Sequence, residues 1–178
     1  SITNPAQSPD NRIVYIPTDD GKIFTVDVLS HTASLFWEEE SGLQINSIKI
    51  DSSGNLFVVT LGGTNGSTVY SLSPTGSENW HYSVADNNGG TIVHPRLAID
   101  NVRNFVYVPF YDSTENASHL LVLDRVEGNE VFDRLLTGDI AFAGFSTGVP
   151  SIASDGTVYV GSFTTVFALD PEQNFSSK

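Results

Sequence analysis

Short apolar strands separated by polar turns recur along the chain at nearly regular intervals. Four of them alternate around an aromatic side chain, in "RIVYIP" (12–17), "NLFVVT" (55–60), "NFVYVP" (104–109) and "TVYVGS" (157–162). A turn rich in Asp, Asn, Ser or Gly precedes each one, as is typical ahead of a β-strand. The aromatic residues Tyr15, Phe57, Tyr107 and Tyr159 lie 42, 50 and 52 residues apart. Such periods indicate a repeated four-stranded unit.

Two further strands follow each of these anchors, and a weaker one precedes it. The next strand alternates with period two, in "KIFTVDV", "STVYSLS", "HLLVLDR" and "TTVFALD". After another turn, the first three repeats carry a large aromatic residue, at Trp37, Trp80 and Phe132. We expect these rings, like the four anchors, to pack between neighbouring sheets.

Each repeat therefore contains four strands, and the fourth repeat stops after its third. One stretch, "EGNEVFDRLLTG", could compete as a helix through Val131, Leu135 and Leu136, but the register of the repeat predicts a strand there. The expected units are residues 1–41, 42–85, 86–137 and 138–178.

The stretches "SLSPTGSENW" and "VYVGSFTTVFALDPE" resemble the blade repeat of the PQQ-like β-propellers. That repeat runs from a small-residue turn through Val-Tyr-Val, a loop, Ala-Leu-Asp and Thr-Gly to a tryptophan on the outer strand. The first and third copies keep the strand pattern but lose the Thr-Gly turn. The resemblance implies an all-β propeller, or partial propeller, of about four four-stranded antiparallel blades with the last one incomplete.

The strand count leaves three arrangements open. The chain is a segment of a larger propeller, a compact four-bladed ring, or a subunit whose open edges are completed by neighbours. An unclosed array leaves sheet edges that pair with another chain, and a contact that does not close builds a filament. A start at Ser1 and the absence of methionine are expected of a processed protein or of a piece cut from a longer one, and we favour the piece.

Quinoprotein dehydrogenases of this family hold their quinone between a tryptophan and a vicinal disulfide, beside a calcium ion. The present chain has no cysteine, and both of its tryptophans are expected on outer strands. No catalytic, cofactor-binding or metal-binding residue of the family carries over, so we expect no enzyme and no cofactor. "DSSGNL" (51–56) partly resembles a calcium loop, but no closing acidic residue follows, and the stretch is interpreted as a turn.

Charge narrows the choice of partner. Eight Lys and Arg residues against 21 Asp and Glu give a formal net charge of -13. Nucleic acids and anionic lipid surfaces need counter-charge, so neither is expected as a partner. No apolar run approaches the roughly 20 residues that span a bilayer. The expected partners are a protein, neighbouring blades or other subunits.

A few polar residues remain as candidates for a role. His94 and Arg96 stand at the head of a first strand, where a side chain can approach the axial channel and a small ligand. Asn65, Asn116 and Asn174 begin Asn-X-Ser sequons, the acceptor sites of N-linked glycans. Asn65 and Asn116 both fall in long loops between second and third strands, so glycans there would decorate one rim.

These observations predict a non-enzymatic propeller module for interaction or scaffolding, outside the cell or at its surface, within a larger propeller protein. One alternative is a subunit of an extracellular filament joined through open sheet edges. Another is a partial quinoprotein dehydrogenase that lacks its cofactor residues.

Overall fold

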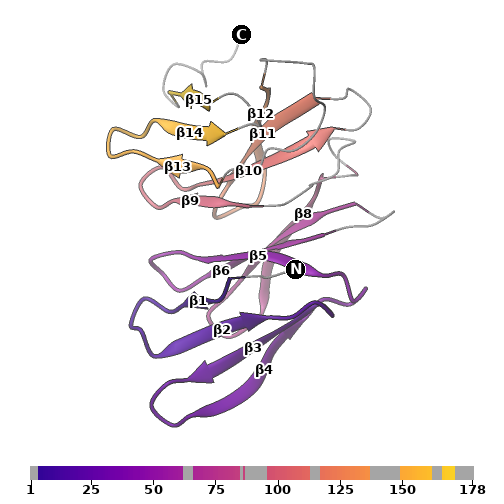
Figure 1. Ribbon diagram of the computed structural model, residues 1–178, viewed down its shortest axis with the longest axis vertical. Coiled ribbons are helices and arrows are strands. Elements are labelled where there is room, and N and C mark those ends of the chain that lie inside the picture. Colours follow the sequence, from indigo (N-terminus) through magenta and orange to yellow (C-terminus); the bar gives the residue numbers. More distant parts are fainter. Residues whose placement is uncertain are drawn as a thin grey trace.

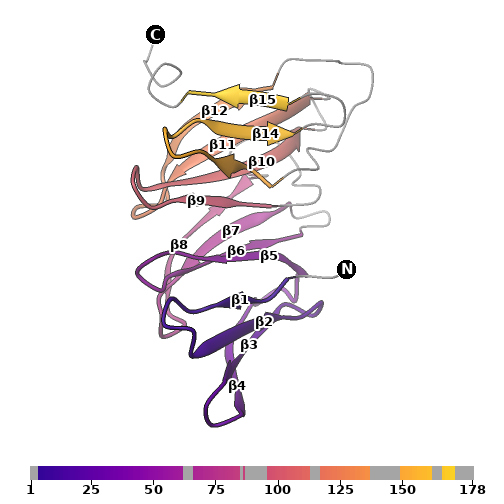
Figure 2. The same ribbon diagram turned by 60° about the vertical axis from the view of Figure 1, so that its left-hand side comes forward.

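The computed structural model describes residues 4–61, 66–84, 86, 96–112, 117–136, 149–161 and 166–170. The strands bounded within these ranges form four antiparallel sheets, each built from consecutive strands in chain order. Both views show the sheets following one another along the long axis, from the indigo first sheet to the yellow fourth sheet (Figures 1 and 2). The all-β expectation is confirmed.

The first two sheets have four strands each, with one edge formed by the first strand and the other by the last. The first sheet consists of β1 (Ala6–Gln7), β2 (Ile13–Pro17), β3 (Lys22–Asp27) and β4 (Thr32–Glu38). The second sheet consists of β5 (Ile45–Ile50), β6 (Leu56–Thr60), β7 (Thr68–Leu72) and β8 (Glu78–Ser83).

The third sheet repeats this plan, and the fourth has three strands among the described residues. The third sheet consists of β9 (Ala98–Asp100), β10 (Phe105–Asp112), β11 (Ala117–Asp124) and β12 (Glu130–Leu135). The fourth sheet consists of β13 (Ser151–Ile152), β14 (Val158–Gly161) and β15 (Val166–Leu169). The ambiguous stretch around Val131 is strand β12, as the repeat register predicted.

Short polar side chains shape the turns that join these strands. In the turn after β3, the Asp27 carboxylate accepts hydrogen bonds from the backbone N–H groups of Leu29 and Ser30, at 2.9 and 3.0 Å. These two bonds, with a further one from Arg12, lower the pKa of Asp27 to about 2. Asp124, at the end of β11, accepts the backbone N–H groups of Val126 and Glu127 at 2.8 Å in the same way, so both aspartates close the turn between the third and fourth strands of their sheet.

Apolar residues of adjacent sheets pack face to face. Three buried clusters fill the spaces between first and second, second and third, and third and fourth sheets. The first strands of successive sheets also contact one another, β1 with β5, β5 with β9 and β9 with β13. The first strands thus gather along one side of the array, which is the position expected nearest a common axis.

Candidate functional site

The junction between the second and third sheets is built around a buried carboxylate. Asp51 follows β5 and is 1% exposed. Its Oδ1 accepts the N–H groups of Ser53 and Asn55 at 2.9 and 2.8 Å, and its Oδ2 accepts the Asn55 amide at 3.0 Å. The "DSSGNL" stretch is therefore a turn closed by its own aspartate, as interpreted from the sequence.

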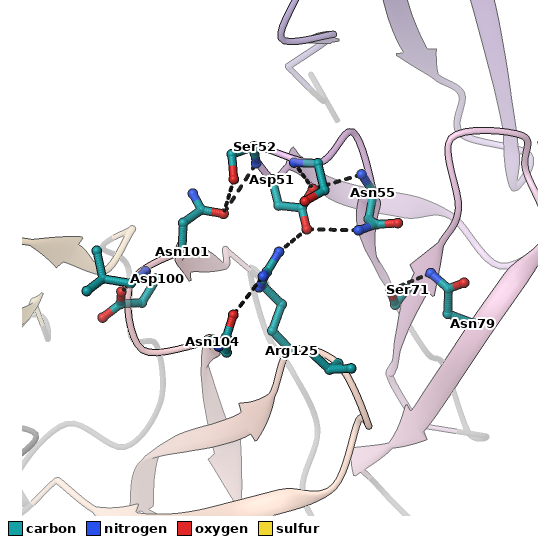
Figure 3. A network of polar contacts seen from close by, with 12 residues as sticks. Asp51, Ser52, Asn55, Ser71, Asn79, Asp100, Asn101, Asn104 and Arg125 are labelled. Carbon is teal, nitrogen blue, oxygen red and sulfur yellow. Dashed lines mark hydrogen bonds and ion pairs between the residues drawn. The ribbon is translucent and has the colours of Figure 1, made fainter.

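A single arginine of the third sheet reaches this carboxylate. Arg125 begins the turn between β11 and β12, and its Nη1 forms an ion pair with Oδ2 of Asp51 (Figure 3). Its Nη2 donates to Oδ1 of Asn104 at 2.7 Å, and its backbone N–H to the Asn104 carbonyl at 2.7 Å. The two side chains are 13% and 0% exposed. A charged pair removed from water in this way is specific in geometry, because either partner alone would be a buried, uncompensated charge.

Two further contacts join the same turns. The hydroxyl and the N–H of Ser52 both donate to Oδ1 of Asn101, each at 3.3 Å. Trp80, on β8, donates its indole N–H to the carbonyl of Arg125 at 3.1 Å. Its ring covers Gly128, where a Cβ atom would lie 2.5 Å from the ring. Trp80 therefore seals the seam between the second and third sheets, which is the role predicted for it.

An arginine also joins the third and fourth sheets. Arg103 lies in the turn between β9 and β10, and its Nη1 donates to Oδ2 of the buried Asp100 at 3.2 Å. Its Nη2 donates to the carbonyl of Asp155, in the turn between β13 and β14, at 3.2 Å. The second-to-third and third-to-fourth junctions are thus built alike. In each, an arginine from a turn of the third sheet binds a buried carboxylate and a residue of another turn.

The first and second sheets are joined at a different place. Glu39, just after β4, is 5% exposed and accepts a 3.3 Å hydrogen bond from the hydroxyl of Tyr70 on β7. Its other oxygen accepts the N–H of Leu43 at 2.9 Å. Burial, followed by the charge of Glu39, raises the pKa of Tyr70 to about 12. The centroid of the Trp37 ring lies 5.0 Å from that of the Tyr70 ring, so this tyrosine contacts the first sheet through both its ring and its hydroxyl.

Three of the four anchor aromatics are buried between sheets. Tyr15, Phe57 and Tyr107 are 5%, 1% and 1% exposed, and each belongs to the cluster that joins its sheet to the next one. Tyr159 is 42% exposed, and its packing against a further sheet stays a prediction. It occupies the corresponding face of the fourth sheet, the last sheet that the structure describes.

The outer-strand aromatics also require one correction. Trp80 and Phe132 lie four residues after the positive-φ glycine of the preceding turn, but Trp37 lies six residues after the positive-φ residue of its turn. Leu35 holds the equivalent position in β4 and is 51% exposed. Trp37 reaches the second sheet from farther along its strand, while Phe132 packs against the cluster between third and fourth sheets.

Several other candidates lie outside the described residues. These are His94 and the three sequon asparagines, Asn65, Asn116 and Asn174. Arg96 is described and exposed, two residues before the start of β9. Within the described ranges, no group of three or more His, Cys, Asp or Glu residues is arranged to hold a metal ion. The same ranges contain no helix of the length and apolarity needed to cross a membrane.

Sequence reasoning missed Asp51, Arg125 and Arg103 as the residues that join sheets. Composition could have drawn attention to the two arginines, because basic residues are scarce in this chain and Arg103 and Arg125 both lie in turns. Nothing in the pattern connects Asp51 to Arg125, which lies 74 residues away.

No family model matches the sequence, and no curated protein matches it. Among solved structures, the crystal structure of BamB from Moraxella catarrhalis, a β-propeller, superposes on 96% of this chain with a TM-score of 0.67 and 19% sequence identity. The match covers 50% of the length of that protein, so the chain spans about half of it. The fold is therefore a β-propeller array of four antiparallel sheets, and the predicted fold class is confirmed.

Proposed function

We propose that this chain is a non-enzymatic β-propeller module that serves as a scaffold for protein–protein interaction within a larger propeller. The supporting observation is that its buried acidic side chains lie at the junctions between sheets and bind residues there. Asp51 and Asp100 each bind an arginine that also contacts a neighbouring turn, and Glu39 binds a tyrosine of the next sheet. These groups stabilise the junctions between sheets. A scaffold needs such rigidity, because it must hold its binding surface in a fixed shape.

The surface formed by the turns offers a place for a protein partner. Val102 and Val126 are 87% and 60% exposed, at the tips of two turns of the third sheet. The same turns are bonded to each other through Arg125 and Asn104. Exposed aliphatic side chains on a rigid base provide contact area at little cost in entropy, and apolar groups rimmed by polar ones are typical of protein interfaces.

Membership of the PQQ-like repeat family belongs to the same proposal. The quoted motifs support it, because "VYVG" and "VFAL" form β14 and β15 while "SLSPTGSENW" spans the turn from β7 to β8. The half-length match to another propeller supports a place in a larger array.

A location outside the cell or at its surface is the remaining part of the proposal. It is supported by the sequons at Asn65 and Asn116, which fall between β6 and β7 and between β10 and β11 in the chain. Treating the protein from its native source with an N-glycosidase is expected to lower its intact mass. An unchanged mass equal to that of the bare polypeptide would remove this support.

Photo-crosslinking tests the scaffold role. A photoreactive amino acid at position 102 of the protein in its native source is expected to yield discrete crosslinked proteins. The added substitution Val126→Asp should reduce them, whereas Lys49→Asp, at an exposed site on β5, should not. Pyrroloquinoline quinone with calcium should leave the melting temperature unchanged. Saturable quinone binding would replace the scaffold role by that of a partial quinoprotein.

A further inference from the structure

Two aliphatic side chains stand on neighbouring turns at one end of the third sheet. Val102 lies between β9 and β10 and is 87% exposed, and Val126 lies between β11 and β12 and is 60% exposed. The backbone N–H of Arg125 donates to the carbonyl of Asn104 at 2.7 Å, which joins the two turns side by side. The third sheet has a described sheet packed on each face, so these turns lie within the array.

An aspartate fixes the backbone of each of these turns. One carboxylate oxygen accepts the N–H of the valine, at 2.9 Å for Asp100 and Val102 and at 2.8 Å for Asp124 and Val126. The same oxygens accept the N–H of the following residue at 3.0 and 2.8 Å. Because the backbone is already ordered, a partner that contacts the two valines loses little conformational entropy by ordering them.

The turns around the two valines carry an excess of negative charge. Residues 51–55, 100–104, 124–129 and 153–157 contain two basic residues against five acidic ones, which are Asp51, Asp100, Asp124, Glu127 and Asp155. Both basic residues are already bound to buried aspartates, Arg125 to Asp51 and Arg103 to Asp100 (Figure 3). Among the described residues, no basic side chain pairs with Asp124 or Glu127, which flank the exposed valine of their turn. The local excess of acidic residues is therefore left to attract positive charge.

We propose that this turn surface, formed by Val102, Val126, Asp124 and Glu127, binds a protein segment in which aliphatic side chains stand next to lysine or arginine. The proposal rests on the proposed function, because it takes the scaffold role as given and adds the chemistry of the partner. The valines supply the apolar contact. The carboxylates beside them determine which charge the partner carries there.

Charge separates this partner from the alternatives. An acidic or phosphorylated segment would bring like charge to a surface whose two arginines are already engaged. A second copy of this chain would do the same, since each copy carries a formal net charge of -13. A neutral apolar segment would contact the valines but gain nothing from the carboxylates. A basic segment gains both, and complementary charge increases the rate and the selectivity of association more than the affinity.

Fluorescence anisotropy with labelled synthetic peptides tests the proposal on the full chain. The probe is a short peptide that alternates lysine and leucine. One comparison peptide has glutamate in place of lysine, and another has serine in place of leucine. The lysine–leucine peptide is expected to bind saturably, and both comparison peptides should bind more weakly. Added salt should weaken the binding of the probe, because it screens exposed charges.

Two pairs of variants locate the binding site. Glu127→Lys should lower the association constant at least about fivefold, because an exposed ion pair contributes up to about that factor and the new lysine repels the probe. Glu40→Lys, at another exposed acidic residue, changes the net charge equally and should have a smaller effect. Val126→Ser should lower the constant about fivefold through lost apolar contact, whereas Leu29→Ser, 76% exposed in the corresponding turn of the first sheet, should not. Circular dichroism verifies that each variant retains its strands.

Three outcomes would overturn the proposal. One is the absence of saturable binding of the lysine–leucine peptide, and another is equal or tighter binding of the glutamate–leucine peptide. The third is an equal loss for Glu127→Lys and Glu40→Lys, which would mean that the probe responds only to the net charge of the chain. The scaffold role has a separate result. Crosslinks from position 102 that Val126→Asp reduces and Glu127→Lys leaves unchanged would retain the scaffold and remove the basic partner.

Discussion

Replacing Arg125 by methionine removes the charge that faces the buried carboxylate of Asp51. Methionine keeps a long side chain in the same space, so the change acts mainly on the ion pair and its hydrogen bonds. In the variant, Asp51 keeps the three hydrogen bonds from Ser53 and Asn55, but its carboxylate loses the positively charged guanidinium as a partner. Asn104 loses its donor as well. We expect the second and third sheets to separate more easily.

The burial of the pair sets the size of the effect. Removing one partner of a buried ion pair costs about 3–5 kcal/mol of the free energy of unfolding. The three remaining bonds on Asp51 place the expected loss near the lower end, about 3 kcal/mol. Arg12→Met is the matched control, because Arg12 also pairs with an aspartate, Asp27, but its side chain is 58% exposed. Exposed pairs contribute about 0–1 kcal/mol.

Urea unfolding followed by tryptophan fluorescence measures both losses. Trp80 donates to the carbonyl of Arg125, so its emission reports on this junction. The cycle is completed by Asp51→Asn and by the double variant with Arg125→Met. Because the double variant leaves no unpaired charge, it should be more stable than the sum of the two single losses predicts.

Two results would refute this reasoning. One is a loss for Arg125→Met no larger than that for Arg12→Met. The other is strict additivity of the two substitutions at the junction. Either would mean that the pair of Asp51 and Arg125 is a consequence of the packing of the two sheets and not a cause of it.

Two further predictions concern the same seams between sheets. Gly128→Ala should lower the free energy of unfolding by more than 2 kcal/mol, since the residue has a positive φ and Trp80 occupies the space of its Cβ. Gly42→Ala, also at positive φ but with open space, should cost about 1 kcal/mol, and equal losses in denaturant would contradict the steric argument. Burial, followed by the charge of Asp100, raises the pKa of Tyr107 to about 12, so the contribution of this residue to stability should be constant below about pH 10 and fall from about pH 10 to 12 as the unfolded tyrosine ionises. Tyr107→Phe should make that fall smaller and preserve stability at pH 7, while Tyr70, whose pKa is also raised to about 12, keeps its own share of the fall. An unchanged alkaline profile would show that Tyr107 does not contribute to it.

The strand plan was predictable because it depends on local pattern. Period-two alternation and polar turns specify where strands begin and end, and the repeat settled the one ambiguous stretch in favour of β12. The repeat also indicated which aromatic residues face a neighbouring sheet, and Tyr15, Phe57 and Tyr107 are buried there. Both properties follow from residues close together in the chain.

The sequence was less informative where the answer depends on turn length, on what covers a face, or on contacts between distant residues. The turn before β4 places Trp37 two residues farther along its strand than Trp80, so sharing a residue type did not mean sharing a position. Tyr159 has the right position but no described sheet beyond it. The pairing of Arg125 with Asp51 crosses 74 residues and two sheets, and no single-chain pattern reports such a distance.

Several of the few basic residues of this chain are placed at turns. Arg12, Arg103 and Arg125 are all paired with aspartates in or beside turns. The sequence has 21 acidic residues against eight basic ones, so negative charge exceeds positive charge by 13. Like charge over the remaining surface opposes random association, since every approach brings negative groups together. The exposed valines at positions 102 and 126 therefore offer the proposed partner an apolar contact that does not depend on opposite charge.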